Sequence, residues 1–423
     1  MNDEAKNRVV NLSPGQLDWI LSPEAIRAQA QRIFELCQAG KTAFIYDAEK
    51  LASTVDYVLS VIRRKYPDLK IPFHSRWGHF RAGGIDRIVK IDQFLAGHEP
   101  VEKARCKLDL VITSVLLDAG AGAQWKYLES RSPENHSPKN HTPETYSRSE
   151  GLGLASLSLF LSGKLSHDSR SLQADSVGLS AVTARAIEEC FQVSPTNPLL
   201  GVDGRVALLC NLAKAVEDRA LFCNGRPGNI IDLLISRHGH CVTATQILRA
   251  VLDGFGPIWP GRLSANNVNL GDVWLYSPFA GTVLAENLVP FHKLSQWMTY
   301  SLIEPILEAG IEVRGVENLT GLAEYRNGGL MIDSGLLRLR DSAQAKMAWE
   351  PSSDLIIEWR ALTVYLLDQI GAKVQTALGK TPAEFPLAKV LEGGTWWAGR
   401  FLAREKRADG SPPLNIISDG TVF

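Results

Sequence analysis

The sequence predicts a mainly α-helical fold of two lobes with a few short strands. Apolar residues recur at helical spacing along most of the chain, and strand-like runs are few and short. Strands and helices also do not alternate as they do around a parallel sheet. A chain of 423 residues that is 45% hydrophobic and 22% charged has ample material for a core. We therefore expect one continuous domain over residues 1–423, with its functional site in the cleft between the lobes.

The first predicted helix has the clearest boundaries. Ser22 is a residue type that caps helix N-termini, Pro23 suits the first helical position, and the apolar pattern that follows runs to Gly40. Asp47 is predicted to cap a second helix, in which Leu51 and later apolar residues recur at helical spacing. The remaining predicted helices cover residues 101–117, 149–163, 172–190, 203–218, 244–254, 291–308, 353–377 and 385–404.

Three short runs are predicted to be strands, at 71–73, 273–276 and 330–339. Residues 129–148 differ from their surroundings, because they contain three prolines, two histidines and almost no apolar side chains. Such a segment does not offset its ordering entropy, so we expect a mobile polar surface loop. Its flanks are rich in glycine and charge and suit a flap near a ligand site, whereas a decorative insertion explains the composition equally well.

The charge balance and the cysteines restrict the class of protein. The formal charge is −1, from 45 Lys and Arg against 46 Asp and Glu, so no extended nucleic-acid surface is expected. The six cysteines form no C-x-x-C pair, which is typical of a reducing compartment. The polar N-terminus and the lack of a long apolar run predict neither a signal peptide nor a membrane contact. We therefore expect a cytoplasmic protein.

Compact cofactor and metal motifs are not found in the sequence. The Gly-Lys-Thr triplets at 40–42 and 379–381 lack the upstream glycine of a phosphate-binding loop. His238 and His240, followed by Cys241, lack a fourth ligand at a sensible spacing for a metal ion. We therefore expect no cofactor and no bound metal.

The stretch FHSRWGHF at 73–80 places charged and aromatic residues where a packed core would hold aliphatic ones. His74 and Arg76 suit the binding of an anion, and Trp77 suits contact with a flat group. The alternative is a surface turn whose Trp77 packs inward.

A second stretch, LLDAGAG at 116–122, ends in small residues that allow a ligand to approach the backbone. Asp118 ends a very apolar helix, either as a structural group or as a carboxylate in a dry environment. In a dry environment its pKa would rise, and it would exchange a proton near neutrality. Trp125 follows shortly after.

A third stretch, PFHKLSQW at 290–297, opens a strongly apolar helix. Lys293 and Gln296 lie one turn apart on one face, directly after His292. A lysine beside an apolar helix more often packs its stem on its neighbours and extends its ammonium into water, and this alternative stays open.

A fourth stretch, LTGLAEYRNGG at 319–329, combines charges with glycines. Thr320 is predicted to cap a single turn that presents Glu324, Tyr325 and Arg326 before a glycine stop. The alternative is that these adjacent opposite charges are simply solvated.

With these stretches the chain resembles the uracil-catabolism family of fungi and bacteria, nearly from end to end. Two departures are Gly78, where an arginine is expected, and a polar stretch at 130–145 that is longer than usual. The resemblance implies a pathway that opens the uracil ring to a ribosylurea species and then parts urea from ribose. The strings that carry the resemblance include FHSRWGHF (73–80), LLDAGAG (116–122), SRSEGL (147–152), GPIWPGRL (256–263), LVPFHKLSQWMTYSLIEP (288–305), LTGLAEYRNGGL (319–330) and SDGTVF (418–423).

A second, more distant resemblance is to the queuosine-salvage nucleotide N-ribohydrolases. It is confined to Asp118-Ala119 with Trp125, to the stretch 291–296, and to residues 324–326, where that family has aspartate in place of Glu324. It implies cleavage of a base–ribose bond, and a helical fold that resembles the helix-hairpin-helix DNA glycosylases.

Together the residues and the resemblances predict a metal-independent N-glycosyl hydrolase, so that 1–423 would be one catalytic domain. Its expected partner is a small-molecule nucleoside or nucleotide, namely ribosylurea or its 5′-phosphate, which it would cleave to urea and ribose or ribose phosphate. The alternatives are an amidohydrolase that attacks the ureido group and a non-catalytic metabolite-binding protein. The sequence carries no signal for an oligomeric state.

Three residues are predicted to be catalytic and to line one enclosed pocket. Glu324 would be the anion and the base that positions water, since N-glycoside cleavage passes through an oxocarbenium-like ribose. Lys293 would orient that carboxylate or contact the sugar or phosphate. Asp118 would bind the departing urea, with Trp125 as a wall. Candidates for the 5′-phosphate are His74, Arg76 and Arg326, and the predicted substrate-binding set is completed by Trp77, His292, Gln296 and Tyr325.

Overall fold

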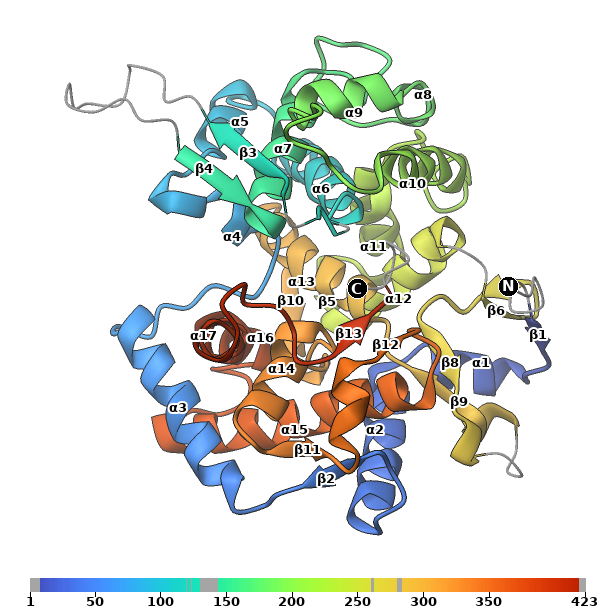
Figure 1. Ribbon diagram of the computed structural model, residues 1–423. Helices are drawn as coiled ribbons and strands as arrows, with labels where there is room; N and C mark the ends of the chain where they lie inside the picture. The colour runs from blue at the N-terminus through green and yellow to red at the C-terminus, as the bar shows by residue number, and fades with distance from the viewer. Residues whose placement is uncertain are drawn as a thin grey trace. The chain divides into compact units, whose positions relative to one another are not determined.

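The computed structural model describes residues 8–118, 120–122, 124–129, 144–259, 262–279 and 284–417 (Figure 1). The mainly α-helical fold class is confirmed. Within the described residues the strands are short, and the largest sheet has three of them. The chain divides into two compact units: unit 1 comprises residues 1–75, 241–300 and 313–423, and unit 2 comprises 76–240 and 301–312.

Helices provide most of the regular structure in both units. Those of unit 1 are α1 (Pro14–Ile20), α2 (Pro23–Gln38), α3 (Lys50–Lys65), α12 (Ala244–Phe255), α14 (Tyr325–Asp333), α15 (Asp354–Leu378), α16 (Leu387–Val390) and α17 (Trp396–Lys406). Those of unit 2 are α4 (Trp77–Phe80), α5 (Val89–Phe94), α6 (Pro100–Leu116), α7 (Arg148–Leu161), α8 (Ser176–Ser180), α9 (Ala184–Cys190), α10 (Val202–Ala215) and α11 (Ile230–His238). Helix α13 (Lys293–Glu308) begins in unit 1 and ends in unit 2.

The strands pair in small ladders. The largest sheet has the order β1-β6-β7, and β8 pairs antiparallel with β9 directly before α13. The strands are β1 (Arg8–Val10), β2 (Phe44–Tyr46), β3 (Lys126–Glu129), β4 (Glu144–Ser147), β5 (Cys241–Thr243), β6 (Leu263–Ala265), β7 (Val268–Asn269), β8 (Val273–Leu275), β9 (Leu288–Pro290), β10 (Glu312–Arg314), β11 (Leu337–Leu339), β12 (Ala348–Trp349) and β13 (Asn415–Ile416).

The core of unit 1 is built from packed helix pairs. Helix α15 packs along α2, and α14 packs along α17 (Figure 1). The second pair approaches very closely at Gly399, where an added Cβ atom would lie only 2.1 Å from the carbonyl oxygen of Arg326. This close approach holds the N-terminal turn of α14 in a fixed position.

The core of unit 2 is centred on α6, which packs against α7, α10 and α11. Its residues from Leu108 to Leu116 are all buried, so its polar members need internal partners. Asp109 accepts hydrogen bonds from the Arg226 guanidinium and from the amide of Gly228. Ser114 contacts the hydroxyl of Ser156 at 2.6 Å.

Most predicted helices are found, and the errors have local causes. Ser22 caps α2 as predicted, since its hydroxyl accepts from the amide of Ala25. The predicted cap at Asp47 is wrong, because α3 begins at Lys50 and the Asp47 carboxylate accepts from the amide of Glu49. The predicted helix 172–190 is broken between α8 and α9.

The strand predictions succeed only in part. Strand β8 confirms most of the run 273–276, but residues 71–73 form no strand. The run 330–339 contains the end of α14 and only then β11. Apolar residues of a short buried helix end were therefore mistaken for a strand.

The predicted loop 129–148 has ordered ends. Glu129 belongs to β3, residues 144–147 form β4, and the two strands pair antiparallel with Tyr127 opposite Tyr146. Arg148 already belongs to α7. Residues 130–143 lie outside the described residues. Among the described helices, none is both long and apolar enough to cross a lipid bilayer.

Candidate functional site

Glu324 occupies the N-cap position of α14 and uses both carboxylate oxygens there. One oxygen accepts from the amide of Asn327 at 2.6 Å, and the other accepts from the amide of Arg326 at 2.8 Å. Glu324, rather than the predicted Thr320, is therefore the cap of this turn. The cap fixes the carboxylate at the positive end of the helix, where negative charge is stabilised.

Burial raises the pKa of Glu324 to about 7. The hydrogen bond from Asn327 and the positive charges of His74 and Lys293 act in the opposite direction, but they do not cancel the loss of hydration. At neutral pH the carboxyl group is therefore present in both protonation states. A group in this condition is suited to take up or release a proton.

His74 is held beside this cluster by a glutamate that the sequence did not single out. The imidazole Nδ1 lies 2.8 Å from Oε2 of Glu392, and both side chains are largely buried. The ring of Trp396 lies against the imidazole, with the ring centroids 6.0 Å apart. The backbone amide of His74 donates to the carbonyl oxygen of Ala388 at 3.0 Å, which ties this segment to α16.

The start of α13 is anchored by a buried ion pair. Both carboxylate oxygens of Asp272 accept from the guanidinium of Arg360 at 2.7 Å, and one also accepts from the amide of Lys293 at 3.1 Å. Although burial favours the neutral acid, the charge and hydrogen bonds of Arg360 hold the pKa of Asp272 below its usual range. This pair thus fixes the first turn of α13 and the position of Lys293.

The other two predicted residues of this turn have structural partners. His292 adopts a left-handed backbone conformation, with φ of 46°, and its Nε2 lies 2.9 Å from the carbonyl oxygen of Ile20, to which it donates. Burial lowers the pKa of His292, so the imidazole is neutral at physiological pH. Gln296 is fully buried and hydrogen-bonds the hydroxyl and amide of Thr320.

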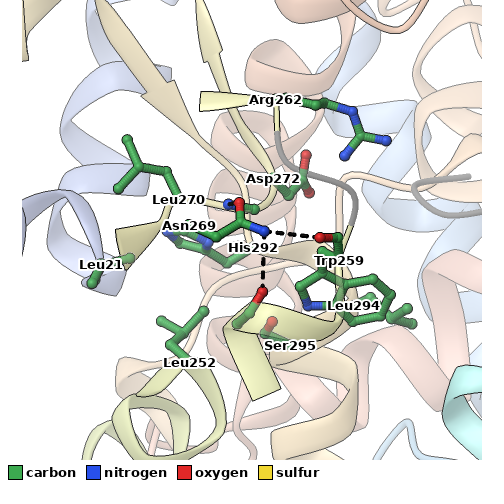
Figure 2. Close-up of a pocket in the computed structure, with 12 residues that line it drawn as sticks. Leu21, Leu252, Trp259, Arg262, Asn269, Leu270, Asp272, His292, Leu294 and Ser295 are labelled. Atoms are coloured by element: carbon green, nitrogen blue, oxygen red, sulfur yellow. Dashed lines mark hydrogen bonds between the residues drawn. The ribbon is translucent and has the colours of Figure 1, made fainter. Parts of the chain in front are cut away.

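A pocket opens next to this turn in unit 1 (Figure 2). Its empty volume of about 470 Å³ includes space open to solvent, and His292, Leu294 and Ser295 are among the residues that line it. Asn269 is among the residues that line it and donates to the carbonyl oxygens of Gly256 and Trp259, as the dashed lines in Figure 2 show. Glu324 does not line this pocket, which is therefore distinct from the cluster of Glu324, Lys293 and His74.

Asp118 and Arg76 form a buried ion pair in unit 2. The Nη1 of Arg76 lies 2.9 Å from Oδ1 of Asp118, and its Nε donates to the hydroxyl of Ser114 at 2.6 Å. The Arg76 side chain is fully buried, and burial lowers its pKa against the opposing effect of Asp118. Burial lowers the pKa of Arg205 to about 10, although the negative charge of Asp118 acts to raise it.

Several predicted binding residues have packing contacts that explain their position. Trp77 donates from its indole to the carbonyl oxygen of Ser301 at 2.7 Å, so it packs inward, as the alternative interpretation held. The indole of Trp125 donates likewise to Phe191 at 2.9 Å. Their role in substrate binding stays a prediction.

The two predicted binding residues after Glu324 lie at the start of α14. The guanidinium of Arg326 is buried and donates to the carbonyl oxygen of Gly410 at 2.8 Å. The ring of Tyr325 lies 4.8 Å from that guanidinium.

Some predicted site residues therefore lie together in unit 1, and others belong to unit 2. Glu324, Lys293 and His74 lie close enough in unit 1 to interact electrostatically. Asp118 and Arg76 belong to unit 2, where they pair with each other. Among the described residues, no group of three or more His, Cys, Asp or Glu side chains is arranged to hold a metal ion.

A family model described as "Protein of unknown function (DUF1688)" matches residues 19–423. A protein of Schizosaccharomyces pombe named "Protein urg3" is 37% identical over 418 residues, which cover 96% of this chain and 98% of the relative. "Uracil catabolism protein 4" of Lachancea kluyveri is 34% identical over 445 residues, which cover 96% of this chain and 99% of that protein.

Proposed function

This chain belongs to the DUF1688 family, and we propose that it acts in uracil catabolism as an N-glycosyl hydrolase. Its substrate would be a ring-opened nucleoside or nucleotide, ribosylurea or its 5′-phosphate. The products would be urea and ribose or ribose phosphate. The pathway is proposed because a relative that matches nearly the whole chain carries the name "Uracil catabolism protein 4".

One observation supports the reaction class above the others, namely the environment of Glu324. A buried carboxyl group with a pKa of about 7 is held rigidly by two backbone amides and lies near the positive charges of Lys293 and His74. Hydrolysis of an N-riboside needs an anion beside the positively charged ribose and a base that takes a proton from water. A fixed carboxylate of this kind meets both needs.

In the proposed mechanism Glu324 acts in its ionised form. It orients a water molecule toward C1′ of the ribose and accepts a proton from that water as the new C–O bond forms. Lys293 orients the carboxylate and favours its ionised state, since its charge lowers the pKa of Glu324. The predicted binding roles of Asp118, Arg76 and Trp125 in unit 2 are a separate part of the proposal.

The test is product analysis with the purified full-length protein. Incubation with ribosylurea, with and without the 5′-phosphate, is expected to release urea together with ribose or ribose phosphate. Ammonia as the product would instead identify an amidohydrolase that acts on the ureido group. Binding without turnover would identify a metabolite-binding protein, and either result would contradict the proposal.

The role of Glu324 is tested by substitution. Glu324→Gln keeps the size of the side chain but removes the base, and losing a stabiliser of developing charge commonly lowers the rate ~10²–10³-fold. Glu324→Asp keeps a carboxylate and has the residue that the queuosine-salvage enzymes have at this position. It is expected to retain part of the activity. The matched control is Glu350→Gln, at an exposed position of unit 1. Near-normal turnover by Glu324→Gln would refute the assignment.

A further inference from the structure

N-glycoside hydrolysis needs an acid as well as a base, because urea is a poor leaving group unless its nitrogen is protonated as the bond to C1′ breaks. The sequence suggested no residue for this task. His74 lies close enough to Glu324 to influence it electrostatically, and it is a proton-carrying side chain that the mechanism above does not use.

The imidazole of His74 is oriented by Glu392. A carboxylate only accepts hydrogen bonds, so the contact of 2.8 Å requires that Nδ1 of His74 carries a hydrogen. Within the described part of the chain, Nε2 of His74 makes no hydrogen bond to another residue. Nε2 is therefore the ring atom available to a ligand, and it donates a proton when the imidazole is protonated on both nitrogens. A carboxylate–imidazole pair is a common way to stabilise that imidazolium and to fix the Nδ1–H tautomer that remains after the transfer.

Glu392 owes its position to an unusual backbone conformation. It lies in a π-helical turn, Leu391–Thr395, between α16 and α17. Such turns are rare and occur often at functional sites. Two glycines allow the turn to pack tightly, because a Cβ atom at Gly393 would lie 2.5 Å from Ile71 and one at Gly394 would lie 2.7 Å from Val58.

The same turn and α16 fix the segment that carries His74. Ile71 contacts the turn three residues before His74, and the amide of His74 donates to the carbonyl oxygen of Ala388 in α16. Both members of the His74–Glu392 pair are therefore held by one rigid part of unit 1. An arrangement that fixes both groups is expected when the orientation of a side chain matters for chemistry.

We propose that His74 is the acid that protonates the departing ureido nitrogen, and that Glu392 is the positioning residue that orients it. This inference rests on the proposed glycosidase activity, and it assigns His74 a role other than phosphate binding. As the C1′–N bond breaks, the nitrogen takes the bonding electron pair and receives the proton from Nε2 of the His74 imidazolium, which becomes the neutral Nδ1–H imidazole. Water adds to C1′ and gives its proton to Glu324, so that urea and ribose form. Proton exchange with solvent then restores both groups.

The test compares two substrates that differ in their need for an acid. Ribosylurea requires protonation of its leaving group, whereas the 4-nitrophenolate of 4-nitrophenyl β-D-ribofuranoside departs unaided. His74→Asn and Glu392→Gln are expected to lower kcat/KM for ribosylurea by ~10²–10⁴ while affecting the nitrophenyl riboside much less. Glu324→Gln is expected to lower kcat/KM for both substrates. His98→Asn, at an exposed histidine, is the matched control and should change neither.

Two further outcomes separate this inference from the proposed function. If wild-type protein cleaves neither substrate, the glycosidase proposal fails, whatever His74 does. If wild-type protein is active but His74→Asn lowers kcat/KM equally for both substrates, or for neither, the acid role is refuted.

The positioning role of Glu392 has its own readout. In a pH titration, the ¹⁵N chemical shifts of wild-type His74 are expected to show that the neutral ring keeps its hydrogen on Nδ1. This preference should change in Glu392→Gln and return in part in Glu392→Asp. Unchanged ¹⁵N chemical shifts of His74 in a folded Glu392→Gln protein would refute the positioning role of Glu392.

Discussion

At the level of single residues, Glu324 has two roles that act against each other. As a helix cap it accepts two backbone hydrogen bonds, but burial raises its pKa to about 7. The folded protein therefore binds a proton more tightly than the unfolded chain, in which the pKa is near 4.5. The stability that this provides is complete below pH 4.5 and is lost as the pH rises through about 7.

The first prediction follows from the loss of stability as Glu324 ionises at higher pH. Glu324→Gln carries no charge at any pH, so above pH 7 it avoids the cost of a buried carboxylate, about 3 kcal/mol. We expect it to be more stable than wild-type protein at pH 8 and similar to it at pH 4.5, as measured by urea unfolding. The kcat/KM of wild-type protein should rise with pH up to about pH 7, as Glu324 ionises. Parallel stability curves for the two proteins would contradict this prediction.

A second prediction concerns the buried pair of Asp118 and Arg76 in unit 2. Asp118→Asn leaves a fully buried guanidinium without its charge partner, and breaking a buried pair costs ~3–5 kcal/mol. The exposed pair of Asp86 and Arg81 is the control, because Asp86→Asn should cost about 1 kcal/mol or less. Urea unfolding measures both values, and equal losses would show that burial of the pair does not matter.

At the level of elements, the contact of α14 with α17 links the site to the core. Helix α14 begins at the Glu324 cap, and α17 follows the π-helical turn that carries Glu392. Gly399 allows the two helices to approach, because no side chain separates it from the carbonyl oxygen of Arg326. The distance between these helices therefore determines where both carboxylates lie.

The third prediction is that Gly399→Ala impairs both stability and activity. Its Cβ atom would lie 2.1 Å from a backbone oxygen, which cannot rotate away, and overpacking of this kind costs ~1–3 kcal/mol. The control is Gly204→Ala in α10, where an added Cβ atom would have no neighbouring atom within 4 Å. Alanine at this position should be neutral or stabilising. Thermal unfolding and kcat/KM of both variants provide the measurement. A fully active, stable Gly399→Ala protein would contradict the role given to this contact.

Elements with local signals could be predicted, and those that depend on distant contacts could not. Helix α2 was predicted because Ser22 and Pro23 define its start within the sequence itself. Helix α14 was missed because it contains Gly328 and Gly329 and is stabilised by packing against α17 rather than by propensity. Local residue types do not reveal such a helix.

The same distinction explains which site residues were predicted. Glu324 stood out as a charge among glycines and an aromatic residue, which is a local pattern. Glu392 did not, because a glutamate within the predicted helix 385–404 resembles an ordinary solvated charge, and its partner His74 lies 318 residues away. Asp272 and Arg360, 88 residues apart, were missed for the same reason.

At the level of the whole molecule, the charge balance gives the fourth prediction. With a formal charge of −1, the chain lacks the basic excess that holds a polyanion through counterion release. We expect no measurable binding to a short labelled DNA duplex near physiological ionic strength, as tested by fluorescence anisotropy. A salt-dependent affinity in the micromolar range would contradict the expectation that the partner is a small molecule.

The division into two units has a consequence for biosynthesis. The N-terminal stretch of unit 1 leaves the ribosome first, but α15, on which α2 packs, is translated only after the long segment 76–240. At roughly 5–20 residues per second, the 303 residues from Arg76 to Leu378 (378 − 75), the end of α15, take roughly 15–60 s to be made. During this time the part of α2 that packs on α15 has no native cover. The nascent chain is therefore expected to depend on chaperones, and its yield in a foreign host should improve at low temperature.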